Sequence, residues 1–129
     1  REHPDALAGA GGPVCCHGWW TPDHVPVAGD EVACVVDFEH ALAAPAEYDY
    51  WRTVVPTFDD GPSRDAFRAG YESVRSLPGD LGARRPLYLA LLGVYYVESL
   101  YVQDQHGPAA TEQRASRFRD LVFGALDDC

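Results

Sequence analysis

The sequence predicts an α+β fold, mostly α, in which a β-hairpin packs on about four helices. Two short apolar runs at 25–27 and 32–36 flank a tight Ala-Gly-Asp turn, a pattern typical of a β-hairpin. Four later segments repeat apolar residues at helical spacing, and proline or glycine separates them. With an apolar fraction of 47% over 129 residues, the chain can form the core of one small domain.

The first third of the chain is expected to contain the strands. Residues 1–13 have the composition of a connector, because three glycines lie close together between two prolines. Residues 13–16 are expected to form an entering strand or an extended segment before the hairpin. A hairpin of this size is not stable alone, so its apolar side should rest on the helices. Residues 40–46 hold four alanines and one proline and are predicted to be a loop or short turn.

Residues 47–127 are expected to be the helical part of the domain. The spacing of apolar residues predicts helices over 47–55, 63–77, 84–105 and 111–126. Pro56 should end the first helix, Ser63 should cap the second and Thr111 should cap the fourth. The third helix is apolar nearly all round and is expected to be buried. A membrane span is disfavoured, because an acidic residue interrupts the apolar run before it reaches about 20 residues.

The charge balance bears on the partners of the protein. The formal net charge is −10, and all ten basic residues are arginine. Nucleic-acid binding needs a basic surface that releases counterions, and docking on anionic lipid needs basic residues too. We therefore expect no nucleic-acid partner and no membrane partner. Adaptation to high salt is one hypothesis for the acidic, lysine-free composition, and a GC-rich genome is another.

The cysteines and the absent methionine bear on where the chain comes from. The cysteines at 15, 16, 34 and 129 show no CxxC pair, and no secretory signal is present. They are expected to be free or buried thiols in a reducing cytoplasm, which predicts a cytoplasmic protein. The chain contains no methionine, and we expect it to be cut from a longer protein.

Most of the polar chemistry converges at one end of the hairpin. The segment from His17 to His24 precedes its first strand and Asp37 follows its second, so a hairpin should bring them together. Kinase catalytic loops place an acid two residues after a histidine and an asparagine seven residues after it. Such enzymes also need hard oxygen ligands, because Mg²⁺ must neutralise the triphosphate.

The spacing of three segments resembles that of the aminoglycoside phosphotransferase family. The segments are His-Gly-x-x-x-Pro-x-x-Val at 17–25, Val-Asp-Phe-Glu-His-Ala at 36–41 and Tyr-Asp at 48–49. These kinase-like enzymes phosphorylate small molecules such as aminoglycosides, choline and homoserine. The resemblance implies the C-terminal lobe of a protein-kinase-like fold, with residues 14–39 as the catalytic-loop and metal-binding hairpin. It also implies ATP and Mg²⁺ as cofactors and the hydroxyl group of a small molecule as acceptor.

The resemblance assigns roles to five residues. Asp37 matches the Mg²⁺-binding acid, and His17 matches the structural histidine that opens the catalytic loop. Asp49 matches an acid that accepts hydrogen bonds from the backbone of that loop. Trp19 stands where the family has its catalytic aspartate, and His24 stands where it has a metal-binding asparagine. His24 is therefore expected to assist Asp37 in binding the metal and its nucleotide.

Two departures from the family pattern weaken the expected activity. Trp19 offers no base and no acceptor, and loss of a general base typically costs about 10²–10⁴ in rate. Imidazole at His24 suits Mg²⁺ less well than an amide oxygen does. The chain also has no lysine and no Gly-rich loop ahead of residue 14, which kinase-like enzymes use to bind ATP. We therefore expect a truncated phosphotransferase whose N-terminal ATP-binding lobe is absent.

Two other functions are compatible with the sequence. The first is a catalytically degenerate, pseudokinase-like lobe or binding module that keeps the fold without turnover. The second, more remote, is a metal-dependent hydrolase with Zn²⁺ bound by several polar residues near the hairpin. Its candidate ligands are Cys15, Cys16, His17, His24 and Asp37. Zinc sites prefer pairs of cysteine or histidine at regular short spacing, which disfavours this set.

Overall fold

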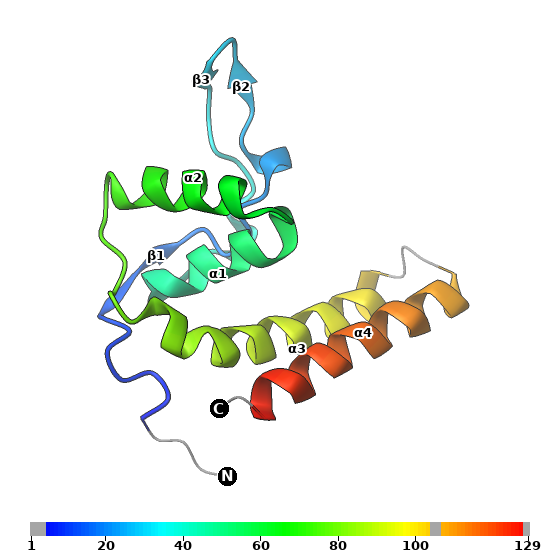
Figure 1. Ribbon diagram of the computed structural model, residues 1–129. Helices are drawn as coiled ribbons and strands as arrows, with labels where there is room; N and C mark the ends of the chain where they lie inside the picture. Colours follow the sequence, from blue (N-terminus) through cyan, green and yellow to red (C-terminus); the bar gives the residue numbers. More distant parts are fainter. Residues whose placement is uncertain (1–4, 104–106, 128–129) are drawn as a thin grey trace. The chain divides into compact units, whose positions relative to one another are not determined.

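The computed structural model describes residues 5–103 and 107–127, and its elements are labelled in Figure 1. The predicted fold class is confirmed, because these residues form four α-helices and two small antiparallel strand pairs. The chain divides into two compact units, residues 1–81 and 82–129. The expectation that the whole chain forms one lobe stays a prediction.

The sheet that supports the site joins strands from either side of the hairpin. Strand β1 (Pro13–Cys16) runs antiparallel to β4 (Leu42–Pro45), and Cys15 lies opposite Ala43. The prediction of a loop over 40–46 was therefore wrong at the four residues of β4. Their alanine-rich sequence is a poor strand signal by itself. These residues form a strand because they pair with β1, which lies much earlier in the chain.

The hairpin predicted at 25–36 is present, but its strands are short. Strands β2 (Val27–Ala28) and β3 (Glu31–Val32) pair antiparallel, and they extend away from α1 and α2 in Figure 1. Val27 and Val32 are 67% and 61% exposed. The expectation that the apolar side of the hairpin rests on helices was therefore wrong for these two valines. The strand pair β1–β4 packs on a helix instead.

Helix α1 (Ala46–Thr57) follows β4 without an intervening loop and carries the core of the first unit. It buries Tyr50, Trp51 and Val54, as the apolar stripe in the sequence predicted. The helix does not end before Pro56, which lies inside its last turn. Phe58 follows as the C-cap, and its backbone N–H donates to the carbonyl of Val54.

Helix α2 (Gly61–Glu72) begins earlier than predicted. Its N-cap is Asp60 rather than Ser63, because the Asp60 carboxylate accepts from both the backbone N–H and the hydroxyl of Ser63, each at 2.8 Å. These bonds hold the pKa of Asp60 below its ordinary value. The helix also ends at Glu72, five residues before the predicted end.

The second unit is a pair of helices that pack along their length. Helix α3 (Arg85–Gln103) follows a short 3-10 turn, and α4 (Pro108–Asp127) packs against it. Gly93 lies at the contact, where an added Cβ would meet Val122. The prediction that Thr111 caps the last helix was wrong, since Thr111 lies buried inside α4. The predicted end of the third helix at residue 105 lies outside the described residues.

None of the helices within residues 5–103 and 107–127 is long and apolar enough to cross a bilayer.

Gly18, the second residue after β1, is the position where the backbone most needs glycine. Its φ is +83°, and an added Cβ would overlap the carbonyl oxygen of His40. We expect Gly18→Ala to lower the free energy of unfolding by about 2–3 kcal/mol, from the left-handed backbone and the clash together. Urea denaturation followed by circular dichroism measures this change.

Gly29→Ala is the matched control for this prediction. Gly29 has a φ of +65°, but nothing lies within 4 Å of an added Cβ. This variant should lose only the backbone term of about 1 kcal/mol. Equal losses in the two variants would show that Gly18 does not need the close approach to His40.

Candidate active site

The loop that follows β1 is held by a buried carboxylate from the first turn of α1. Asp49 is 8% exposed, and its two oxygens accept from the backbone N–H groups of His17 and Gly18, at 2.6 and 2.8 Å. β4 runs antiparallel to β1 and leads directly into α1, and Asp49 in the first turn of this helix reaches back to the backbone that follows β1. The carboxylate therefore sets the direction in which the loop leaves the sheet.

His17 connects this loop to the segment that carries Asp37. Its Nε2 lies 2.8 Å from the carbonyl oxygen of Val36, and its Nδ1 accepts from the backbone N–H of Trp19 at 3.3 Å. Because Nδ1 accepts, the proton belongs on Nε2, which donates to the carbonyl. The ring also packs against that of Phe38, with centroids 4.5 Å apart. One ring nitrogen of His17 therefore bonds within its own loop, and the other bonds the segment that carries Asp37.

Asp37 has an unusual backbone conformation. Its φ and ψ are +66° and +58°, and it is the one residue other than glycine with a positive φ among those that the structure describes. A left-handed conformation costs a non-glycine residue roughly 1–2 kcal/mol, and such strain is concentrated at functional sites. The side chain is 39% exposed, so its carboxylate is accessible to a ligand.

His24 lies against the Asp37 carboxylate. Its Nδ1 is 2.7 Å from the carbonyl oxygen of Trp19, and its Nε2 is 3.1 Å from Asp37 Oδ2. Donation from Nδ1 to the carbonyl leaves Nε2 facing the carboxylate. The pair is an ion pair when His24 carries both protons. When His24 is neutral, the Nε2 lone pair and the carboxylate point at the same space, as two ligands of one cation would.

Trp19 fills the position that the family resemblance reserves for an acid. Its ring centroid lies 5.1 Å from that of His40 and 6.3 Å from that of His24. The buried guanidinium of Arg52 lies over the same ring, with Cζ 5.6 Å from the centroid, and Nη1 donates to the hydroxyl of Tyr48. An aromatic ring stacked on a cation therefore stands where a base would be needed.

Sequence reasoning did not identify Arg52 as part of the site. Arg52 follows Asp49 by three residues on α1, so both lie on the same face of the helix. Once Asp49 was assigned to hold the loop, this spacing was the signal that could have placed Arg52 under the loop as well.

The chain matches a known protein family over most of its length. The family model described as the phosphotransferase enzyme family matches residues 1–87 of the 129. The chain belongs to the phosphotransferase enzyme family. The matched region contains all five residues that the resemblance assigned: His17, Trp19, His24, Asp37 and Asp49. The chain has no significant match among curated proteins or solved structures.

This member of the family has two side chains that could hold a divalent cation. Asp37 supplies a hard oxygen ligand and His24 a nitrogen ligand, and their facing atoms are 3.1 Å apart. Within the described part of the chain, no group of three or more His, Cys, Asp or Glu side chains could hold a metal ion. Two protein ligands fit an ion such as Mg²⁺, which commonly completes its coordination with water and phosphate oxygens.

The zinc-hydrolase alternative finds no support in the arrangement of the cysteines. Cys15 is exposed and Cys16 is buried, because successive residues of β1 point to opposite faces. Burial, with a smaller effect from the Asp49 charge, raises the pKa of the Cys16 thiol to about 11. A zinc ligand must be a thiolate, so Cys16 is poorly suited to bind the metal.

The raised pKa of Cys16 predicts that its thiol reacts slowly with alkylating reagents. At pH 8, iodoacetamide should alkylate the exposed Cys15 and Cys34 in the native protein and leave Cys16 unmodified until the chain is unfolded. Peptide mass spectrometry separates these sites. Alkylation of Cys16 at the rate of Cys15 would contradict the assignment.

The same pKa sets the sign of a pH effect on stability. The thiol ionises near pH 9.0 in the unfolded chain but near pH 11 in the folded protein. Between these values the unfolded state binds fewer protons than the folded state. The contribution of Cys16 to the free energy of unfolding should therefore fall as the pH rises from about 9 to about 11.

Proposed function

We propose that this protein acts in ATP-dependent transfer of a phosphoryl group to the hydroxyl of a small molecule, as the half that binds the metal ion and the acceptor. The observation that carries the proposal is the approach of His24 Nε2 to Asp37 Oδ2, 3.1 Å apart, beside a loop held by Asp49. Membership of the phosphotransferase enzyme family supports the reaction class.

Each residue of the site has a role in this proposal. Asp37 binds the divalent cation through its exposed carboxylate, and His24 assists through Nε2. A bound Mg²⁺ would neutralise phosphate charge, which is the main requirement of phosphoryl transfer. Asp49 and His17 hold the two segments at a fixed separation, so the cation ligands need no rearrangement when the nucleotide arrives.

The proposed activity also needs groups that these residues do not supply. Kinase-like enzymes cover the phosphates with a Gly-rich loop and contact them with a strand lysine. The 129 residues contain no lysine. Turnover therefore depends on a nucleotide-binding half that carries such groups.

A second candidate function follows from Trp19. Its ring lies close to two histidine rings and to the Arg52 guanidinium, and it offers no proton acceptor to the substrate hydroxyl. This arrangement favours a pseudokinase-like protein that binds metal and nucleotide without efficient transfer. The two candidates share the cation site and differ only in turnover.

The location of the cation site can be tested with Mn²⁺. Manganese accepts both oxygen and nitrogen ligands and broadens NMR signals of nearby nuclei. We expect substoichiometric Mn²⁺ to broaden the signals of His24 and Asp37 first, and Asp37→Asn to abolish this selectivity. Equal broadening at exposed acids elsewhere, such as Asp30 at the hairpin turn, would contradict the proposed site.

A further inference from the structure

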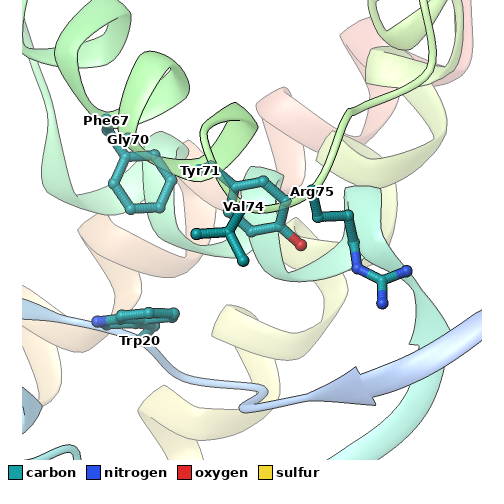
Figure 2. A pocket seen from close by; sticks show the side chains of 6 residues that line it. All are labelled: Trp20, Phe67, Gly70, Tyr71, Val74 and Arg75. Atoms are coloured by element: carbon teal, nitrogen blue, oxygen red, sulfur yellow. The ribbon is translucent and has the colours of Figure 1, made fainter.

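A cavity lies between the loop after β1 and helix α2, and its lining includes neither His24 nor Asp37. Its volume is about 450 Å³, within the range of about 300–1,000 Å³ typical of small-molecule sites. Figure 2 shows the residues that line it, which are Trp20, Phe67, Gly70, Tyr71, Val74 and Arg75. All of them belong to the first unit.

The shape of this cavity favours a flat ligand. The indole of Trp20 forms one wall, and Phe67, Tyr71 and Val74 from α2 and the turn after it face it from the other side (Figure 2). Val74 is 91% exposed, although it is apolar and directed into the cavity. A planar ring between the indole and α2 would cover this valine and stack on an aromatic face.

One end of the cavity carries its polar groups. Arg75 is the charged member of the described lining, and the Tyr71 hydroxyl lies on the same side (Figure 2). Burial raises the pKa of Tyr71, so its hydroxyl stays protonated and can donate a hydrogen bond. The planar guanidinium of arginine matches a carboxylate with two parallel hydrogen bonds. Both groups therefore favour an anionic oxygen group at this end.

We propose that the cavity between Trp20 and α2 binds a flat aromatic carboxylate. The ring lies between the Trp20 indole and Tyr71, and the carboxylate lies at Arg75 and the Tyr71 hydroxyl. The protein carries a net charge of −10, so binding of an anion here depends on this local arginine rather than on the overall field. The proposal does not depend on phosphoryl transfer, because none of the lining residues belongs to the cation site.

Calorimetric titration of the whole chain with 2-naphthoate tests the proposal. We expect saturable binding with one site, and binding about tenfold weaker for the uncharged 2-naphthalenemethanol, which keeps the ring and loses the anion. Equal affinity for the two compounds would overturn the role of Arg75. Absence of saturable 2-naphthoate binding at its solubility limit would overturn the site.

Four variants separate recognition from folding. Arg75→Gln should weaken 2-naphthoate about tenfold and leave 2-naphthalenemethanol unchanged, and Trp20→Ala should weaken both compounds about tenfold. Gly70→Leu should block both, because Gly70 lines the cavity and an added Cβ meets nothing within 4 Å. A leucine there also suits the helix, so this variant should stay folded. Arg117→Gln, at an exposed position on α4, should change nothing.

Gly70→Leu, the variant that fills the cavity, gives the clearest outcome of this series. If Gly70→Leu binds 2-naphthoate as tightly as the unchanged protein does, the ligand lies elsewhere and the proposal is overturned. This result would leave the proposed function untouched, since Mn²⁺ binding at Asp37 is measured separately.

Discussion

Replacement of Asp49 by alanine is expected to lower the free energy of unfolding by about 3–6 kcal/mol, the sum for two hydrogen bonds to a charged acceptor. The buried carboxylate accepts from the backbone N–H groups of His17 and Gly18, and alanine would leave both donors without this partner. The loss is comparable to the whole stability of a small domain. Urea denaturation followed by circular dichroism should show a large decrease in the midpoint.

Two further variants test whether the carboxylate itself is responsible. Asp49→Asn keeps one acceptor oxygen and places an NH₂ group against a donor, so its loss of stability should be intermediate. Asp65→Ala removes an exposed carboxylate from α2 and should change the midpoint little. An Asp49→Ala variant as stable as Asp65→Ala would show that the loop does not depend on this anchor.

Replacement of Trp19 by aspartate is expected to raise the rate of phosphoryl transfer by about 10²–10⁴, which is the usual contribution of a general base. The substitution places a carboxylate in the loop that Asp49 holds, beside the Arg52 guanidinium that now lies over the indole. A nearby cation favours the ionised, proton-accepting form of the new acid. The measurement is single-turnover transfer from labelled ATP to aminoglycoside, choline and homoserine acceptors, with a nucleotide-binding half supplied.

The control for this gain is Trp19→Asn, which opens the same space without adding a base. It should leave the rate near that of the unchanged protein. An equal gain in Trp19→Asn and Trp19→Asp would show that the indole only blocks access. No gain in either variant would favour the pseudokinase-like function.

The hairpin and the four helices could be predicted from sequence because local signals specify them. Apolar spacing and turn residues predicted both, and the four helices differ from the prediction chiefly at their ends. Strand β4 could not be predicted, since its alanines become a strand only by pairing with β1. The sequence predicted Ser63 as the N-cap of α2, whereas the N-cap is Asp60. Both residues have side chains that can cap a helix, so only the backbone shows which of them accepts the capping hydrogen bond.

The roles of the candidate site residues stay predictions, and their contacts could not be predicted from sequence. Spacing and the family resemblance singled out His17, Asp37 and Asp49, and the structure brings their segments together through the Asp49 and His17 hydrogen bonds. The stacking of Arg52 on Trp19 and the left-handed backbone of Asp37 depend on how α1 and the loop meet. The spacing of Asp49 and Arg52 indicates that both face the loop, but no local pattern in the sequence encodes the stacking on Trp19 or the backbone of Asp37.

The most direct test of the central claim is calorimetric titration of Mg·ATP into the chain and into Asp37→Asn, each with a nucleotide-binding half supplied. The account predicts saturable, Mg²⁺-dependent binding that Asp37→Asn weakens at least about tenfold, because an anionic ligand to the cation is lost. Asp30→Asn, which removes an exposed carboxylate from the turn of the same hairpin, should bind as the unchanged protein does. Equal binding by Asp37→Asn and Asp30→Asn would contradict the assignment of Asp37 as the cation ligand.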